Sequence, residues 1–236
     1  MTDIKFYGHG LPNVQAVQLP GKLIVLEGPD GVGRSTQVAL LREWLESQGY
    51  AVFSSGLRRS ELASAGIEAA KQGHTLGHVT MALFYAADFC DRLEREILPM
   101  LRAGFVVLTD RYIYSLMARA MVRGVDKHWV RSLMGIALVP DAVFYLKTRV
   151  QDLVPRVLST RGFDFWEAGM DFLPTSDYYQ SYAFYQERML RTFDELGAEF
   201  GFEVIDASRP IDAVFADLKA GVGQIVAELK ASEPIS

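Results

Sequence analysis

The sequence predicts an α/β protein in which helices cover both faces of a parallel five-stranded sheet, a three-layer sandwich. Three observations lead to this class: short apolar runs rich in Val, Ile and Phe recur along the chain, longer helical patterns separate them, and the first run ends in a glycine-rich turn. Continuous apolar runs are typical of strands buried on both faces, and helices that alternate with such strands make parallel connections.

The first half of the chain contains three of the expected strands. The apolar runs lie at residues 23–26, 51–53 and 105–108, and the helical patterns between them lie at residues 35–48, 61–72 and 78–102. Gly49 and Gly104 directly follow helical patterns and are the expected helix ends, because glycine commonly adopts the left-handed conformation there. Each helix therefore returns the chain to the same edge of the sheet.

The second half repeats this alternation. Two further apolar runs lie at residues 142–146 and 202–205, and helical patterns lie at residues 112–122, 127–138, 177–199 and 211–229. Residues 1–20 contain two glycines and two prolines before the first strand, so an irregular lead-in is expected. We expect a single domain over residues 21–230 and a short tail over residues 231–236.

The amino-acid composition narrows the range of functions that the protein could have. Half of the 236 residues are hydrophobic and the formal net charge is −5, which favours a soluble globular protein and disfavours an extended surface for a nucleic acid polymer. No apolar run approaches the roughly 20 residues that cross a bilayer, so no membrane partner is expected. The one cysteine, Cys90, excludes a disulfide within the chain and favours the cytoplasm.

A phosphate-binding loop follows the first expected strand. Gly28, Gly31, Gly33 and Ser35 occupy the positions of the P-loop pattern, whereas Arg34 stands where lysine is usual. Unpaired N–H groups at the start of the next helix bind phosphate oxygens, and a serine hydroxyl can bind Mg²⁺. The predicted cofactors are ATP and Mg²⁺, and the predicted ATP-binding residues are Gly28, Asp30, Gly31, Val32, Gly33, Arg34, Ser35 and Thr36. A glycine-rich turn without a ligand is the alternative.

A second group of polar residues follows the expected strand at residues 105–108. Asp110 follows this strand closely and is a candidate Mg²⁺ residue together with Ser35, while Arg111 is placed to compensate charge on a transferring phosphate. The alternative is a helix cap followed by a surface arginine. Together with the upstream loop, the pair favours a P-loop NTPase-type fold whose site lies at the carboxyl ends of the strands.

Together, these motifs are similar to those of a known protein family. The chain resembles thymidylate kinases, which transfer the γ-phosphoryl group of ATP to dTMP, over roughly residues 22–228. The resemblance rests on residues 27–37, on Leu83-Phe84-Tyr85-Ala86-Ala87-Asp88, on Asp110-Arg111-Tyr112, on Trp129-Val130-Arg131, on Pro140-Asp141 and on Val204-Ile205-Asp206-Ala207. It implies a nucleoside monophosphate substrate with dTMP favoured, a contact from Asp30 to the acceptor sugar, a lid at about residues 160–175, and a homodimer.

Several family positions are changed. Ser54 to Ser60 replace the segment whose arginine holds the acceptor phosphate, Phe89 replaces the arginine that lies on the thymine ring, and Arg119-Ala120 replace a Tyr-Gln pair. A phenyl ring can still stack on a base but cannot donate a hydrogen bond. The resemblance gives Asp30, Arg58, Arg59, Phe84, Phe89, Arg111, Arg119 and Tyr185 as the predicted substrate-binding residues, and Arg34, Asp110, Arg111, Arg156 and Arg161 as the predicted catalytic residues.

Three functions remain open at this point. The first is a dTMP kinase in which Arg34, Arg111 and the lid arginines stabilise in-line transfer. The second is a kinase with a different nucleotide or small phosphorylated acceptor, which the changes at Phe89, Arg119 and Ala120 motivate. The third is a nucleotide-binding protein without turnover, motivated by the missing loop lysine and the changed arginines.

Overall fold

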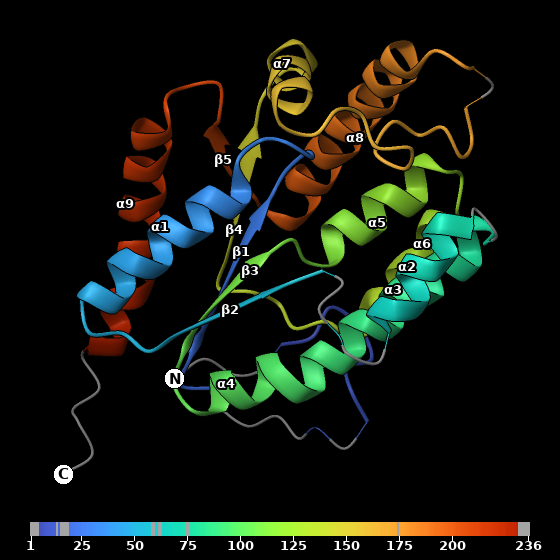
Figure 1. Ribbon diagram of the computed structural model, residues 1–236. Coiled ribbons are helices and arrows are strands. Elements are labelled where there is room, and N and C mark those ends of the chain that lie inside the picture. Colours follow the sequence, from blue (N-terminus) through green and yellow to red (C-terminus); the bar gives the residue numbers. More distant parts are fainter. Residues whose placement is uncertain are drawn as a thin grey trace.

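A parallel five-stranded sheet lies at the centre of the structure, a computed structural model that describes residues 5–12, 14, 19–57, 60, 63–73, 76–173 and 175–230 (Figure 1). The strands are β1 (Lys22–Glu27), β2 (Val52–Gly56), β3 (Val106–Asp110), β4 (Ala142–Lys147) and β5 (Glu203–Asp206). They lie in the order β2-β3-β1-β4-β5, and every neighbouring pair is parallel. The predicted sheet is confirmed, and β1 is its central strand.

Helices cover both faces of this sheet. They are α1 (Arg34–Ser47), α2 (Ser64–Gly73), α3 (His78–Arg92), α4 (Leu98–Arg102), α5 (Ile113–Val122), α6 (Lys127–Leu133), α7 (Val150–Thr160), α8 (Tyr178–Phe200) and α9 (Ile211–Lys230). In Figure 1, α1 and α9 lie on one side of the sheet, whereas α3, α4 and α5 lie on the other. This arrangement is the three-layer sandwich that the alternation of strands and helices predicts.

The side chains of β1 divide between two hydrophobic cores. Ile24 and Leu26 pack in the core that contains α1 and α9, whereas Leu23 and Val25 pack in the core that contains α3, α4, α5 and α8. This division follows from the two-residue period of a strand, which sends successive side chains to opposite faces. Every residue of β1 is buried, and four successive apolar residues, residues 23–26, lie between Lys22 and Glu27.

Two predicted helices differ in detail from the structure. The predicted helix at residues 78–102 is continuous but passes through a π-helical segment, η1 (Leu93–Ile97), between α3 and α4. The predicted helix at residues 127–138 ends as α6 at Leu133 and continues as a short 3₁₀ segment, η2 (Met134–Ile136). Both predicted ends at glycine are confirmed, since Gly49 and Gly104 adopt φ values of 88° and 83°.

Helix α7 is an element that the sequence reading missed. It carries Pro155 in its interior, a residue that removes a backbone donor and usually marks a helix boundary. The helix forms because Leu153 and Val157, four residues apart on one face, are both buried. Val157 packs with Ala168 and Tyr182 in a small separate core beneath residues 161–173.

The described part of the N-terminal lead-in packs on the helical layer. Phe6 forms an isolated antiparallel bridge with Leu138, and the hydroxyl groups of Tyr7 and Tyr114 lie 2.5 Å apart. These contacts hold residues 5–12 against η2 and α5 without adding a strand to the sheet. Along the described residues, the helices lack the combination of length and apolar character that a membrane span requires.

Candidate active site

The loop between β1 and α1 is shaped by three glycines with positive φ. Gly28, Gly31 and Gly33 have φ values of 147°, 82° and 99°. A Cβ atom on Gly28 would lie 2.7 Å from the carbonyl oxygen of Leu146, so the loop runs too close to β4 for a side chain. Gly33 precedes α1 and provides no side-chain cap, so the first N–H groups of that helix are left for an anion.

Arg34 folds back over this loop. Its Nε donates to Oδ1 of Asp110 at 2.8 Å, and its Nη1 donates to the carbonyl oxygens of Gly28 and Pro29. The side chain is 7% exposed. A lysine has no planar fork and could not make these contacts together, so Arg34 both braces the loop and brings a positive charge beside Asp110.

Asp110 and Ser35 meet where β3 lies beside β1. Leu26 pairs with Asp110 in the sheet register, and the Ser35 hydroxyl donates to Oδ2 of Asp110 at 2.7 Å. Burial raises the pKa of Asp110, but the charges of Arg34 and Arg111 and the Ser35 hydrogen bond outweigh it and lower that pKa. The site therefore presents a carboxylate beside a hydroxyl, and both are oxygen ligands that suit Mg²⁺.

These two oxygen ligands fit a magnesium ion that takes its other ligands from phosphate and water, as is usual for Mg²⁺. Elsewhere in the described residues, no three His, Cys, Asp or Glu side chains gather into a metal-binding group.

Asp30 is held between two arginines at the far side of the loop. Nη2 of Arg111 donates to its Oδ1, and Nη2 of Arg119 donates to its Oδ2 at 3.1 Å. Burial of Asp30 raises its pKa, but Arg111, Arg119, Arg34 and Arg161 together lower that pKa well below its ordinary value. Asp30 is therefore a carboxylate at neutral pH, neutralised on both of its oxygens.

Arg111 has two unusual properties. Its backbone adopts φ 75°, the left-handed region that residues other than glycine rarely occupy. Its Nη1 is buried and has no hydrogen-bond partner among the described residues. Burial and the nearby Arg34 lower the pKa of Arg111 to about 10, which still leaves it charged at neutral pH. A buried charged donor without an acceptor suits a bound anion.

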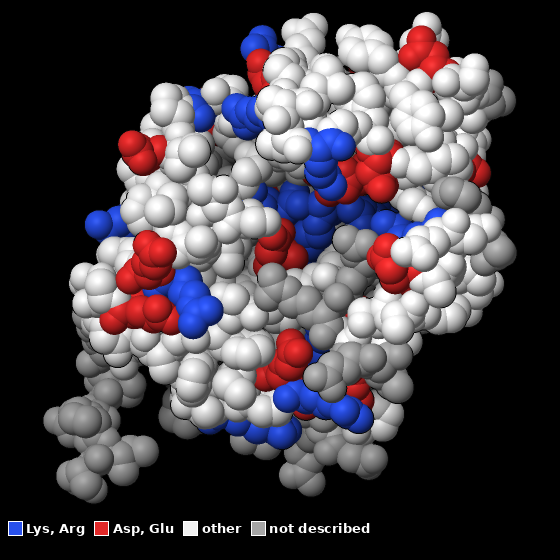
Figure 2. Space-filling model, in the orientation of Figure 1, with Lys and Arg blue, Asp and Glu red and all other residues white. Residues whose placement is uncertain are grey.

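These residues surround a charged cavity at the carboxyl end of the sheet. Its lining is Asp30, Gly31, Arg34, Ser35, Gly56, Leu57, Lys71, Asp110, Arg111, Arg119, Arg161 and Glu167. Figure 2 shows Lys and Arg side chains on the floor of a central hollow, with acidic side chains at its border. Five of the named lining residues are cationic and three are anionic, so the cavity favours an anionic ligand.

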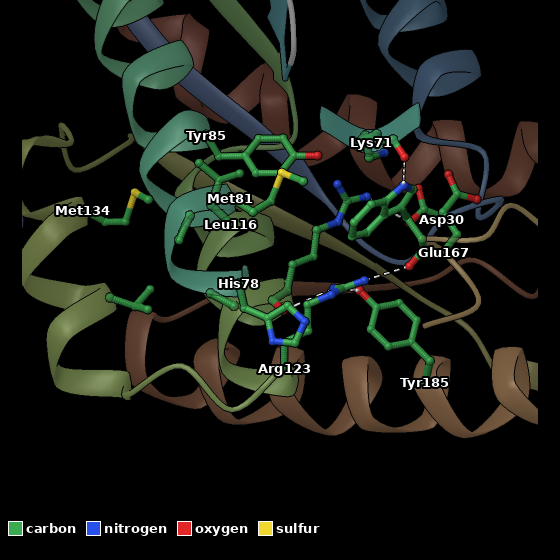
Figure 3. A pocket seen from close by; sticks show the side chains of 15 residues that line it. Asp30, Lys71, His78, Met81, Tyr85, Leu116, Arg123, Met134, Glu167 and Tyr185 are labelled. Carbon is green, nitrogen blue, oxygen red and sulfur yellow. Dashed lines mark hydrogen bonds and ion pairs between the residues drawn. The ribbon is translucent and has the colours of Figure 1, made fainter. Parts of the chain in front are cut away.

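An apolar cavity adjoins the charged one. It is lined from α2 and α3 by Lys71, His78, Met81, Ala82 and Tyr85, from α5 by Leu116, Arg119 and Ala120, and elsewhere by Asp30, Arg123, Val130, Met134, Trp166, Glu167 and Tyr185. Figure 3 shows Tyr85 and Met81 on one side of this cavity and Tyr185 on the other. Asp30, Lys71, Arg119 and Glu167 line both cavities, so the two cavities adjoin at these side chains.

Arg123 lines the apolar cavity and was not predicted from the sequence. Its Nε and Nη2 bind both carboxylate oxygens of Asp171 at 2.7 and 3.0 Å, and its other donors reach the Trp166 carbonyl, the Tyr185 hydroxyl and the Arg119 carbonyl. The guanidinium also lies 4.9 Å from the Tyr185 ring centroid. Arg123 thereby fixes residues 161–173 to α5 and α8, and its four-residue spacing from Arg119 is the only sequence signal for it.

Two predicted substrate-binding residues lie outside both cavities. Phe89 is fully buried and packs edge-on against Tyr112, with ring centroids 5.0 Å apart. Phe84 is half-buried and faces Gly66 of α2. A helix turns about 100° per residue, so α3 directs Tyr85 into the cavity while its neighbour Phe84 faces α2, and Phe89 lies one turn further along in the core. Predicted residues Arg58 and Arg59 lie outside the described residues.

The two predicted lid arginines are separated. Arg161 lines the charged cavity, where its Nη1 and Nη2 bind the two carboxylate oxygens of Glu167 at 3.0 and 2.5 Å. Arg156 lies within α7 and points away from this cavity: both of its Nη atoms donate to the carbonyl oxygen of Ala207 at 3.1 Å. The structure thus brings Arg34, Asp110, Arg111 and Arg161 together but leaves Arg156 apart, beside the chain that follows β5.

A central strand, a glycine loop, a helix N-terminus and a carboxylate on the neighbouring strand define a P-loop nucleotide-binding protein. A family profile described as thymidylate kinase matches residues 26–218. The chain belongs to the thymidylate kinase family, and it is an enzyme, a nucleoside monophosphate kinase. The predicted family is therefore confirmed.

Named relatives agree with this assignment. The chain is 36% identical over 208 residues to "Probable thymidylate kinase 2" of Saccharolobus solfataricus, an alignment that covers 87% of this chain and 97% of that protein. It is 34% identical over 220 residues to "Thymidylate kinase" of Clavibacter sepedonicus, covering 89% and 98%. It is 40% identical over 148 residues to "Probable thymidylate kinase" of Thermococcus kodakarensis, covering 58% and 72%.

Proposed function

We propose that this protein transfers the γ-phosphoryl group of ATP to dTMP, giving dTDP and ADP. The observation that carries the proposal is that an apolar cavity adjoins a charged one, since a nucleoside monophosphate needs an apolar place for its base and a charged one for its phosphate. Family membership supports the acceptor and does not favour another substrate or a protein without turnover.

The donor binds at the loop between β1 and α1. Backbone N–H groups of this loop and the start of α1 hold the phosphates of ATP, and Gly28, Gly31 and Gly33 let the backbone approach them. Ser35 and Asp110 are the residues that would hold Mg²⁺, which neutralises charge on the donor phosphates when bound. Arg34 fixes the loop and Asp110 in this arrangement.

The transfer step needs positioned positive charge. An oxygen of the acceptor phosphate forms a bond to the γ-phosphorus, the bond to the bridging β–γ oxygen breaks, and its electron pair leaves with ADP. Arg111 donates its partnerless Nη1 to the transferring group, and Arg34 and Arg161 add charge around it. This compensation lowers the barrier because charge spreads over the phosphoryl oxygens in the transition state.

The acceptor binds between α3, α5 and α8. Tyr85 and Tyr185 provide aromatic walls for the base, and the Asp30–Arg119 pair offers an acceptor and a donor to the sugar. The acceptor phosphate then lies at the junction of the two cavities, facing the loop. Residues 161–173, held by Arg123, cover this arrangement and exclude water from it.

An exposed face of α3, away from the cavity, supports a homodimer. Val79 and Leu83, four residues apart on α3, are 51% and 45% exposed, and Trp129 of α6 is 37% exposed. We propose that two copies pack through this face and that the enzyme works in the cytoplasm. Leu83→Glu is expected to halve the mass measured by light scattering, and a monomeric unmodified protein would contradict the dimer.

The decisive experiment measures ADP formation from ATP and Mg²⁺ against a panel of nucleoside monophosphates and phosphorylated sugars. Asp110→Ala serves as the control for contaminating kinases. Turnover that is strongest with dTMP supports the proposal. Stronger turnover with another acceptor would show that this acceptor, and not dTMP, is the substrate. Binding of ATP without formation of ADP would contradict the kinase reaction itself.

A further inference from the structure

Arg111 enters the charged cavity from a turn whose backbone is held by the end of β1. The N–H of Arg111 donates to the carbonyl oxygen of Leu26 at 3.0 Å, and the next N–H, that of Tyr112, donates to Oε1 of Glu27 at 2.8 Å. Between these two contacts, the backbone of Arg111 has its φ of 75°. A backbone conformation that costs free energy persists only where the surrounding contacts enforce it, and here β1 supplies two of them.

Glu27 also caps the helix that follows this turn. Its Oε1 accepts from the backbone N–H of Ser115 at 3.1 Å, and its Oε2 accepts from the Ser115 hydroxyl at 2.6 Å. Tyr112 occupies the cap position of α5 but makes no side-chain hydrogen bond to the helix. In a capping box, two residues of the helix start satisfy the N–H groups of the cap and third positions, whereas here one carboxyl group from a distant strand satisfies both.

The side chain of Glu27 is fully buried and lines neither the charged nor the apolar cavity. Burial raises the pKa of Glu27, while the hydrogen bonds from its two partners and the charges of Arg34 and Arg111 oppose this shift. A carboxyl group in the interior is costly unless it is hydrogen-bonded, and each hydrogen bond above ties it to the Arg111 turn or to the start of α5. Its contribution is therefore to hold these two segments on β1.

We propose that Glu27 is a positioning residue for the transfer step, because it fixes the Arg111 turn and thereby the guanidinium that faces the transferring phosphoryl group. The inference rests on the proposed function, since it takes Arg111 to act on that group. Asp30 accepts from Nη2 of Arg111, so Glu27 fixes the backbone of this residue and Asp30 fixes its guanidinium. Transfer depends on positioned charge, so a displacement of the guanidinium by about 1 Å should slow it by about 100-fold.

Three substitutions separate the reach of the Glu27 side chain from its charge. Glu27→Ala removes all three hydrogen bonds and should lower the kcat of ADP formation with dTMP by about 100-fold, while the KM for dTMP changes less than about threefold. Glu27→Asp keeps the charge but is one methylene shorter, so it should lose most of the rate as well. Glu27→Gln keeps the length and can accept from both N–H groups, so its kcat should stay within about tenfold of the unmodified enzyme. Should Glu27→Ala fail to fold, the comparison of Glu27→Asp with Glu27→Gln carries the same test.

A double-mutant cycle shows whether Glu27 acts through Arg111. In single-turnover measurements, adding Glu27→Ala to Arg111→Ala should cause little further loss of rate, and a loss that multiplies with that of Arg111→Ala would overturn the positioning role. Asp177→Ala is the matched control. Asp177 also accepts from two N–H groups at a helix start, those of Tyr179 and Gln180 at 2.9 and 3.1 Å, but lines neither cavity. It should lower stability and leave kcat unchanged.

A second measurement does not depend on turnover. The Arg111 guanidinium is 11% exposed and bound to Asp30, so NMR spectra of the unmodified protein should show its N–H signals protected from exchange, and Arg111→Lys identifies them by their loss. These signals should disappear in Glu27→Ala and Glu27→Asp and persist in Glu27→Gln. Signals that persist in a folded Glu27→Ala would overturn the positioning role. Loss of the signals in Glu27→Ala, together with an unmodified protein that forms no ADP, would overturn the proposed function alone.

Discussion

The donor side and the acceptor side of this site are built in different ways. The donor side consists mainly of backbone, because three glycines bend one loop and the neighbouring strand adds Asp110. The acceptor side consists of side chains from α2, α3, α5, α8 and residues 161–173. A site made from backbone leaves a local pattern in the sequence, whereas a site made from distant side chains allows many residue changes and leaves little pattern.

The largest expected effect tests the donor side at Asp110. Asp110→Ala removes the acceptor of both Arg34 and Ser35, so ADP formation with dTMP should fall by about 100-fold to 1,000-fold. Steady-state kinetics measures this loss. Asp126→Ala, which removes only the cap of α6, should leave turnover unchanged. Turnover of Asp110→Ala close to that of the unmodified enzyme would show that this carboxylate has no part in the reaction.

The second-largest effect on turnover is expected for substitutions of Arg34. Arg34→Met removes the charge and the loop contacts together and should lower turnover by about 100-fold, whereas Arg34→Lys keeps the charge and should stay within about tenfold. The measurement is kcat at saturating ATP. Equal losses in the two variants would mean that the planar fork matters more than the charge, and would make the loop geometry the essential contribution.

On the acceptor side, Tyr85 and Phe89 separate binding from packing. Tyr85→Leu should raise the KM for dTMP by about tenfold, since it removes an aromatic wall of the apolar cavity. Phe89→Leu should leave this KM unchanged and lower the free energy of unfolding by about 1–2 kcal/mol, because Phe89 packs only in the core. A raised KM in Phe89→Leu would return this ring to the site.

The smallest effect concerns the pH dependence of stability at Asp30. The arginines lower its pKa in the folded protein, so below the ordinary value of 3.8 the unfolded chain binds a proton that the folded one does not. Stability is therefore lost as pH falls below about 4, with a slope of about 1.4 kcal/mol per pH unit from this one group.

Asp30→Asn removes this contribution and leaves Arg111 and Arg119 without their shared carboxylate. It should be less stable than the unmodified protein at pH 7, and the difference should narrow as the pH approaches 3. Urea unfolding at several pH values measures this. A difference that stays constant with pH would show that the Asp30 carboxylate contributes no linkage.

The contrast between a donor side built from backbone and an acceptor side built from side chains also explains which features could be predicted from the sequence. The sheet, the glycine loop and the proximity of Ser35 to Asp110 were predictable, because apolar runs and glycine spacing are local signals. Helix α7 was not, because Pro155 interrupts its pattern and burial of Leu153 and Val157 outweighs that proline. Burial in the tertiary structure therefore decided an element that local signals argued against.

The acceptor side shows which features could not be predicted from the sequence. Tyr85 and Arg123 come to line one cavity only when α3, α5 and residues 161–173 pack together. The helical pattern places Tyr85 and Phe89 on the same helix but does not show where the cavity ends. Such positions depend on contacts between segments that are far apart in the chain.

The backbone of Arg111 has an implication for engineering. Its φ of 75° costs about 1–2 kcal/mol in a residue with a side chain, and glycine would adopt the same conformation without strain. Arg111→Gly would relieve this strain, but it would also leave one oxygen of the buried Asp30 carboxylate without its guanidinium partner, which costs more than the strain. A mutant library screened only for survival of heating should therefore retain Arg111, so the strained backbone is kept for stability as well as for phosphate binding.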